Sequence, residues 1–303
     1  ERTRAGEPRG GAKAGMKVLI VERHCKPGGY CTSFTRQGFT FDAAAHSFGG
    51  YRLGKLGSIF KTLEIDKKII INKFDPSDTI ITPDHHISFW ADLDKTTDNF
   101  QAAFPLERNN IKKFFNFLNT PDPASIARMR GWTFQDLLDQ YFNDVKLKTI
   151  LSFPVFGNGG LPPSSMTAYI GTKIFTESLL DGGYHPENGM QALPDALAER
   201  FKEFGGELRL SCTVKKIKIK ENKAAGVITE ENVFVQSNYV VSNSDARQTF
   251  FKLLGNREID HNFLIRLKGM SPTLSMFIIY LGLDEYLSQW PQQRTNAWFL
   301  SHY

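Results

Sequence analysis

A chain of 303 residues, 41% of them hydrophobic and 23% charged, can bury a sizeable core and usually folds as more than one domain. Lysine and arginine (37) only modestly exceed aspartate and glutamate (32), and the basic residues are spread along the sequence. This excludes the dense basic stripe of a nucleic-acid-binding protein. A weak attraction to anionic membrane surfaces is compatible with the charge balance.

The cysteines indicate a reducing compartment. Cys25, Cys31 and Cys212 are odd in number and have no CxxC spacing, which argues against a disulfide framework and a zinc site. The longest apolar run, around Leu274 to Leu283, is far shorter than the roughly 20 residues of a membrane-spanning helix. We therefore expect a cytoplasmic protein, with any membrane contact peripheral and at the inner face.

The first organised element is the run MKVLIVE at residues 16–22. It is short, apolar and rich in β-branched residues, which predicts a fully buried parallel strand. Pro27, Gly28 and Gly29 follow as a tight turn that brings backbone close to a neighbour. Residues 1–15 are atypical in composition, and Pro8 is expected to disturb any helix there.

The remaining elements alternate in character along the chain. The middle is aromatic, with expected strands at 38–42, 68–72 and 87–91 and expected helices at 109–118 and 133–151, the second of which Asp122 or Ser125 would cap. A later block predicts a helix over 193–204 that ends at Gly205 and Gly206, then strands at 207–210, 214–219, 224–229, 233–236 and 239–242. The tail strand is expected at 273–283.

This alternation predicts two domains that are each built from discontinuous segments. A nucleotide-type domain would comprise residues 1–50 and 182–254. A substrate domain would comprise residues 51–181 and 255–303. Tandem domains would not produce this order.

Glu22 closes the strand at 16–22, in the place of the acid that ends the second strand of a dinucleotide-binding fold and accepts hydrogen bonds from the ribose hydroxyls. A surface glutamate that merely ends a strand fits the local sequence equally well. The wider sequence separates these two interpretations.

Four blocks resemble the phytoene desaturase, prolycopene isomerase and retinol saturase family, a branch of the amine-oxidase-like flavoproteins. The blocks are VERHCKPGGYCTSF, GFTFDAAAHSFGG, GGYHPENGMQALPDALAERFKEFGGELRL and VVSNSDARQTF, within residues 16–254. The resemblance implies an α/β fold: a Rossmann-like FAD-binding domain, here incomplete, with an interleaved α+β substrate domain.

The resemblance also implies roles for individual residues. Glu22 would hold the adenosine ribose, and the backbone of Val214 would meet the adenine. Amides without side chains in the way donate to anionic oxygens, so the pyrophosphate and ribityl chain would lie along Gly28, Gly29 and Tyr30, with Ser33 in the same segment. Asn243 and Ser244 would lie close to the cofactor, and residues 42–46 would approach the flavin side of the substrate tunnel. His46 is the catalytic candidate, and a loop histidine held by hydrogen bonds is the alternative.

Two departures from the family pattern lead us to expect a fragment. Gly6, Gly10, Gly11 and Gly15 do not make the GxGxxG loop with which the family begins. The Gly-Asp motif near the family's C-terminus has no counterpart before Tyr303.

The function implied is an FAD-dependent oxidoreductase that exchanges hydride with an apolar polyene, with NAD(P)H as a candidate reductant. Desaturation, saturation and isomerisation remain open, as does the oligomeric state. The aromatic middle segment and tail are expected to build the substrate tunnel. The alternatives are an inactive or lipid-carrying protein of the same fold, like the Rab GDP-dissociation inhibitors, and, third, an amine oxidase. No metal site is expected, because His85 and His86 read as an exposed strand-edge pair.

Overall fold

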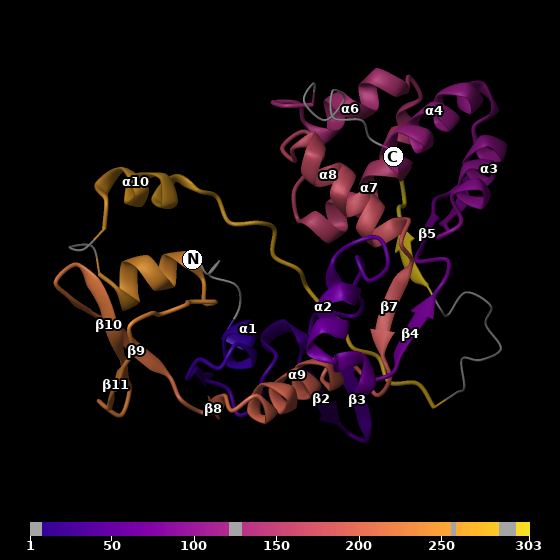
Figure 1. Ribbon diagram of the computed structural model, residues 1–303. Helices are drawn as coiled ribbons and strands as arrows, with labels where there is room; N and C mark the ends of the chain where they lie inside the picture. The colour runs from indigo at the N-terminus through magenta and orange to yellow at the C-terminus, as the bar shows by residue number, and fades with distance from the viewer. Residues whose placement is uncertain (1–7, 121–128, 256–258, 285–294) are drawn as a thin grey trace. The chain divides into compact units, whose positions relative to one another are not determined.

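The computed structural model describes residues 8–120, 129–255, 259–284 and 295–303. The chain forms two compact units, each built from discontinuous segments (Figure 1). Unit 1 is Glu1–Thr32 with Leu193–Pro272, and unit 2 is Ser33–Ala192 with Thr273–Tyr303. The predicted breaks at 50/51, 181/182 and 254/255 therefore differ from the observed ones.

The first two breaks are displaced because residues 33–53 bond to the chain around residue 181. Phe48 and Tyr184 exchange two backbone hydrogen bonds of 3.0 Å each. The buried carboxylate of Asp181 accepts from the backbone nitrogens of Arg52 and Leu53, each at 2.9 Å. These bonds keep both segments in unit 2.

Unit 1 combines a parallel strand pair with an antiparallel meander. Its elements are α1 (Pro8–Lys13), β1 (Leu19–Val21), the short helix η1 (Gly29–Cys31), α9 (Ala192–Glu203), β8 (Glu207–Arg209), β9 (Val214–Lys220), β10 (Lys223–Thr229), β11 (Phe234–Gln236), the π-helix η5 (Gln248–Leu253) and α10 (His261–Gly269). The meander, predicted from its alternation and turns, is confirmed in the order β11–β10–β9.

The first strand is shorter and less buried than expected. Only Leu19–Val21 form β1, all three residues are half-buried, and Met16 is 54% exposed. Within the described residues β1 pairs with one strand only, the parallel β8, so no strand covers its other edge. The expectation that Pro8 would disturb a helix was also wrong. Helix α1 begins at Pro8 itself, where the missing N–H is not needed.

The helix predicted over 193–204 is confirmed as α9, together with its C-cap. Gly205 has a φ of 80°, in the left-handed region that favours glycine. Its nitrogen donates to the carbonyl of Lys202 at 2.8 Å, and Gly206 donates to that of Phe201 at 2.9 Å. These bonds satisfy carbonyls at the helix end and turn the chain into β8.

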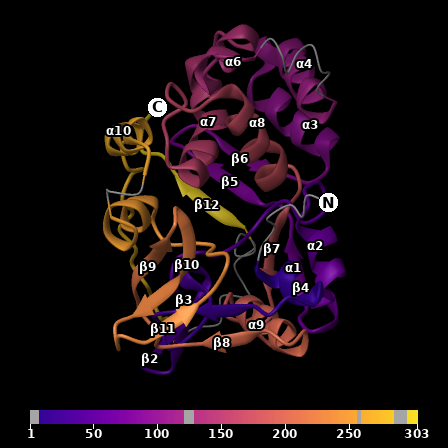
Figure 2. The same ribbon diagram turned by 60° about the vertical axis from the view of Figure 1, so that its left-hand side comes forward.

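Unit 2 contains most of the helices. Its elements are β2 (Ser33–Arg36), β3 (Phe39–Asp42), α2 (Leu56–Leu63), η2 (Ile65–Lys67), β4 (Ile71–Phe74), β5 (Asp78–Ile81), β6 (His86–Phe89), α3 (Leu93–Ala103), η3 (Pro105–Glu107), α4 (Arg108–Asn119), α6 (Phe134–Tyr141), α7 (Val145–Gly159), α8 (Ala168–Ile174), η4 (Phe175–Leu179), β7 (Gly183–Pro186) and β12 (Asn296–Phe299). The strands form the sheet β12–β5–β6 and the two pairs β2–β3 and β4–β7. Figure 2 shows the helices α3, α4, α6, α7 and α8 grouped next to the larger sheet.

The helix expected over 133–151 is two helices. The hydroxyl of Thr133 and the carboxylate of Asp136 form a capping box that begins α6. The chain then leaves the helical conformation at Phe142, and Asp144 caps α7. Glu107 Oε1 accepts from the nitrogens of Asn143 and Asp144 at 2.7 and 3.0 Å, which holds this break in place.

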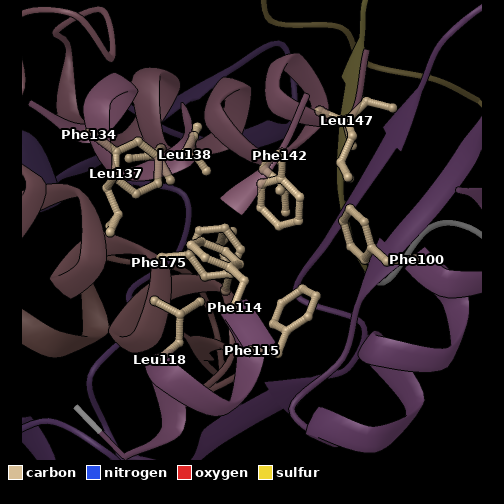
Figure 3. Close-up of a cluster of buried hydrophobic side chains, with 14 of the residues drawn as sticks. Phe100, Phe114, Phe115, Leu118, Phe134, Leu137, Leu138, Phe142, Leu147 and Phe175 are labelled. Carbon is tan, nitrogen blue, oxygen red and sulfur yellow. The ribbon is translucent and has the colours of Figure 1, made fainter. Parts of the chain in front are cut away.

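The core of unit 2 is aromatic and densely packed. Phe114 is fully buried, and its ring lies 5.2 Å from that of Phe142 and 5.9 Å from that of Phe175, both edge to face (Figure 3). Phe89 and Phe100 extend the cluster at 5.2 Å. Such geometry is favourable for ring quadrupoles. These buried rings of the middle segment form a packed core, and a substrate tunnel built by this segment and the tail stays a prediction.

Two predicted strands are absent. Residues 239–242 lie outside any strand, with Tyr239 86% exposed. Residues 273–283 are likewise unpaired, and Phe277 is 90% exposed. A strand needs a partner for its backbone groups, and none of the described strands pairs with either segment. The cap expected at Asp122 or Ser125 falls outside the described residues. Within the described part of the chain, no helix combines the length and the apolar character needed to cross a membrane.

Replacing Phe114 by alanine is expected to cost about 3–5 kcal/mol of unfolding free energy, because it leaves a cavity among rings that cannot collapse to fill it. Urea denaturation followed by tyrosine and tryptophan fluorescence measures the change. Leu106→Ala is the control: this leucine is fully exposed, and its loss should cost less than about 0.5 kcal/mol. Equal effects of the two changes would contradict the packing described.

Candidate functional site

Glu22 follows directly after β1, at its carboxyl end. Its backbone nitrogen donates to the carbonyl of Arg209 at 2.9 Å, and its carbonyl accepts from Cys212 at 2.8 Å. Side-chain Oε1 accepts from the nitrogen of His24 at 2.8 Å. The carboxylate is half-exposed, so it has further acceptor capacity toward solvent or a ligand.

Val214 is brought to the same edge of unit 1. The bond between Cys212 and Glu22 places the chain that enters β9 beside the end of β1. Glu22 and Cys212, which lies two residues before Val214, are therefore neighbours although they are far apart in sequence.

Gly28 and Gly29 both have a φ in the region that favours glycine, and at Gly28 a side chain would also collide with a neighbour. Gly28 has a φ of 127°, and a Cβ there would come within 2.8 Å of Pro194 Cγ at the start of α9. Gly29 has a φ of 58°, and a Cβ there would meet nothing within 4 Å. Tyr30 is 84% exposed. The turn thus packs on α9 at Gly28 and is open at Gly29, which suits the approach of a phosphate to backbone amides.

Asn243 and Ser244 are both exposed and lie in the stretch before η5. The hydroxyl of Ser244 bonds to that of Ser242 at 2.9 Å. Among the described contacts, none joins either residue to Glu22 or to the glycine turn. Their cofactor role remains a prediction.

In unit 2, Asp42 is the centre of a polar network that the sequence analysis did not identify. Ser33 Oγ and the nitrogen of Met190 donate to Asp42 Oδ1 at 2.6 and 2.8 Å. His185 Nε2 lies 2.8 Å from Asp42 Oδ2, so an ionised carboxylate requires this nitrogen to be the donor. The nitrogen of Gln191 in turn donates to Ser33 Oγ at 3.1 Å.

These contacts set the protonation of Asp42. Partial burial by itself would raise the pKa of this carboxyl. The hydrogen bonds from Ser33, His185 and the backbone of Met190 outweigh burial and hold the pKa below its ordinary 3.8. Gly189 fits closely over the network, because a Cβ there would lie 3.2 Å from Asp42 Oδ1.

Ser33 and His46, two predicted site residues, both lie in unit 2. The hydroxyl of Ser33 donates and accepts within the Asp42 network. His46 is exposed and carries no hydrogen bond to another described side chain. Burial raises the pKa of Asp78, and hydrogen bonds from Trp298, Ser77 and Asn296 oppose the rise, with a smaller electrostatic contribution from His46. A catalytic role for His46 stays a prediction.

The β2–β3 hairpin has a polar face and an aromatic face. The register pairs Ser33 with Asp42 on the polar face and Phe34 with Phe41 on the other. On that other face lies a hollow of about 470 Å³. It is lined by Phe34, Arg36, Gln37, Phe39, Phe41, Tyr280 and Gly282. The ring of Tyr280 meets that of Phe34 edge to face at 4.9 Å, and its hydroxyl donates to the carbonyl of Ala43.

The expectation for the histidine pair was half wrong. His86 is exposed at the start of β6, but His85 is half-buried, stacks on Phe104 at 4.6 Å and lies 2.7 Å from the hydroxyl of Tyr303. Among the described residues, no group of three or more histidine, cysteine, aspartate or glutamate side chains could hold a metal ion.

Sequence reasoning placed residues 42–46 near the substrate, but it missed His185, Gln191 and the network that joins them to Asp42. All three lie inside the quoted blocks, and Asp42 ends an alternating apolar strand, where polar side chains often gather. Their meeting depends on contacts across more than 140 positions, which no local pattern reveals.

Residues 11–259 match a family model described as flavin containing amine oxidoreductase. The chain belongs to this family. The resemblance predicted from the four sequence blocks is thereby confirmed, and the mixture of helices and strands confirms the predicted α/β class. The family is named for flavin, the cofactor that the resemblance implied.

Curated relatives narrow the likeness to one branch. The chain is 24% identical to a phytoene desaturase (lycopene-forming) of Pseudescherichia vulneris, over 91% of this chain and 60% of that protein. It is 25% identical to prolycopene isomerase 2 of an Oncidium hybrid cultivar, over 91% and 52%. It is 23% identical to an all-trans-retinol 13,14-reductase of Danio rerio, over 80% and 46%. The chain thus spans about half to 60% of the length of these relatives.

Solved structures share the fold. An oxidoreductase from Methanosarcina mazei superposes with a TM-score of 0.66 at 19% identity, covering 86% of this chain and 61% of that one. A Rab GDI from Plasmodium falciparum superposes with a TM-score of 0.50 at 13% identity, covering 76% and 60%. At these identities the likeness concerns the fold alone.

Gly28→Ala is expected to lower the unfolding free energy by about 1–3 kcal/mol, because alanine is strained at this φ and its Cβ would collide with Pro194. The matched control is Gly38→Ala, at a φ of 84° with nothing within 4 Å of the added Cβ. It carries backbone strain without the collision and should cost less. Urea denaturation of both variants measures the difference, and a smaller cost at Gly28 would contradict the packing against α9.

Asp42→Asn is expected to cost about 1–3 kcal/mol near neutral pH, because the ionised carboxylate accepts charge-assisted hydrogen bonds. A carboxyl whose pKa is lower in the folded than in the unfolded protein stabilises the fold at pH values above its unfolded pKa. This stabilisation is lost as the pH falls through the folded pKa. The free-energy difference between wild type and Asp42→Asn should therefore shrink as pH falls below 3.8, the ordinary value. Urea denaturation across this range measures it, and a difference independent of pH would count against the network.

Proposed function

We propose that this chain is part of an FAD-dependent oxidoreductase that acts on an apolar polyene of carotenoid or retinoid type. The observation that carries the proposal is the edge of unit 1, where the half-exposed carboxylate of Glu22 ends a parallel strand beside the chain leading to Val214. Relatives named as desaturases, an isomerase and a reductase of polyenes support the substrate class.

The residues of unit 1 fit an adenine dinucleotide. Glu22 would accept from the ribose hydroxyls, since its carboxylate has lone pairs beyond the one that His24 uses. The open amides at Gly29 would donate to phosphate oxygens, because no side chain stands over them. A carrier of prenyl lipid has no need for a ribose-binding acid, which favours the flavoprotein over that alternative.

Bound flavin would supply the hydride exchange. The protein's own residues would bind the substrate and orient it. In unit 2 the hollow bounded by Phe34, Phe41 and Tyr280 offers aromatic surface and one cationic rim residue, Arg36. A polyene lacks charge and acidic protons, so burial against such surface is the main binding energy available to it. Asp42 would hold the strand after which residues 43–50 begin, through its bonds to Ser33 and Met190.

Desaturation, saturation and isomerisation would all require these residues to bind and orient a polyene. The relatives described above include a desaturase, an isomerase and a reductase. The chain would meet its substrate in lipid, so we include peripheral contact with a membrane in the proposal. Incubation with a carotene and, separately, with an amine distinguishes the polyene reading from amine oxidation by the product formed.

Glu22→Gln should weaken FAD binding by about 10-fold or more, because hydrogen bonds to a charged acceptor contribute about 1.5–3 kcal/mol. Titration of FAD followed by quenching of its fluorescence measures the affinity. The control is Glu230→Gln, an exposed acid in the turn between β10 and β11. If wild type binds no FAD, or if both variants bind it as wild type does, Glu22 does not hold the cofactor.

A further inference from the structure

The three-stranded sheet β11–β10–β9 of unit 1 has two unlike faces. Along β9, Ile217 is 5% exposed, whereas Lys216, Lys218 and Lys220 are exposed. Successive residues of a strand point to opposite sides, so the three lysines share one face and Ile217 lies on the other. The π-helix η5 packs against β9, and Ile217 is buried on the covered side.

The register extends the exposed face across the sheet. Lys220 is paired with Lys223 of β10, and Lys216 is paired with Ile228, which in turn is paired with Phe234 of β11. Directly paired residues in antiparallel strands point to the same side. Phe234, 50% exposed, therefore stands on the same face as the lysines. We call this set of residues, Lys216, Lys218, Lys220, Lys223 and Phe234, the lysine face.

The concentration of charge on this face is unfavourable for folding. Alternate residues of a strand are about 6.6 Å apart, and the directly paired Lys220 and Lys223 repel one another. No described carboxylate forms an ion pair with any of the four lysines. The acids of this region, Glu221, Glu230 and Glu231, lie in the two turns at the ends of the strands.

Protection of an exposed sheet edge is one use of lysines on β9, since β9 is an edge strand. That use does not account for the exposed aromatic ring on the opposite edge of the same face. Basic side chains beside an exposed aromatic side chain are the combination that binds an anionic lipid surface, where the charges meet headgroups and the ring enters the interfacial region.

We propose that the lysine face is a docking surface for anionic phospholipid membranes. The complementarity is electrostatic, with Phe234 as an apolar contact. The inference deepens the proposed function, since an enzyme that handles a polyene must reach it in lipid. Vesicle binding needs neither flavin nor polyene, so a failure of this proposal and a failure of the proposed function are distinguishable.

The test is flotation of the whole chain with vesicles of phosphatidylcholine containing phosphatidylserine, and with vesicles of phosphatidylcholine alone. Wild type should bind the anionic vesicles, and binding should weaken as salt is added. Lys216→Gln, Lys218→Gln and Lys220→Gln together should reduce the affinity about 100-fold, the effect of removing three basic residues from a charged surface. Phe234→Ser should reduce it by a smaller factor.

The matched control replaces Lys61, Lys112 and Lys113 by glutamine. These lysines are exposed on α2 and α4, so the net charge changes by the same amount, and binding should stay within about 3-fold of wild type by the same electrostatics. The unfolding midpoint of each variant should match wild type, because the changed side chains lie at the surface.

Three outcomes would overturn the proposal: wild type that does not float with anionic vesicles, equal binding to neutral vesicles, or equal loss in the triple variant and its control. Tighter binding of a duplex DNA oligonucleotide than of anionic vesicles would assign the lysine face to nucleic acid and overturn it as well. Phe234→Ser keeps the test decisive if the triple variant is unstable.

Discussion

The carboxylate of Asp42 is the contact on which the organisation of unit 2 around the candidate site depends. It accepts from Ser33, His185 and Met190. These bonds fasten the β2–β3 hairpin to the segment that precedes α9. A partly buried charge requires several donors, and this need explains why segments with an acid, a serine and a histidine converge. It also explains why the unit boundary falls at 32/33 and not at 50/51.

The hairpin held in this way has one polar and one aromatic face. Because side chains alternate along a strand, the residues that bond to Asp42 and those that line the hollow cannot interfere with one another. The large aromatic cluster around Phe114 has a different role: its buried rings pack against one another and stabilise the helices of unit 2. Aromatic content by itself therefore does not distinguish a packed core from a surface that could bind a ligand.

Charge shows the same dependence on three-dimensional arrangement. Along the sequence the basic residues are dispersed, and the formal net charge is only +5. The meander gathers four lysines onto one face, because strand alternation and antiparallel pairing add their effects. The Glu22 edge and the lysine face of unit 1 share one stretch of chain, because Cys212, whose nitrogen donates to Glu22, shortly precedes β9.

The sequence by itself determined the elements whose signals are local. The meander, the helix α9 with its glycine cap, the hairpin strand ending at Asp42 and the four family blocks were all predicted, because turn residues, alternation and motif spacing act over a few positions. The strand predicted at 16–22 is shorter in the structure, and those predicted at 239–242 and 273–283 are absent. Apolar, β-branched residues favour a strand, but a strand forms only where a neighbouring strand pairs with it. The tertiary structure alone decided that Asp42 meets His185, that Cys212 bonds to Glu22 close to the start of β9, and that the rings around Phe114 pack as a core. Each of these depends on contacts between segments that are far apart in sequence, and such contacts produce no periodic pattern in the sequence.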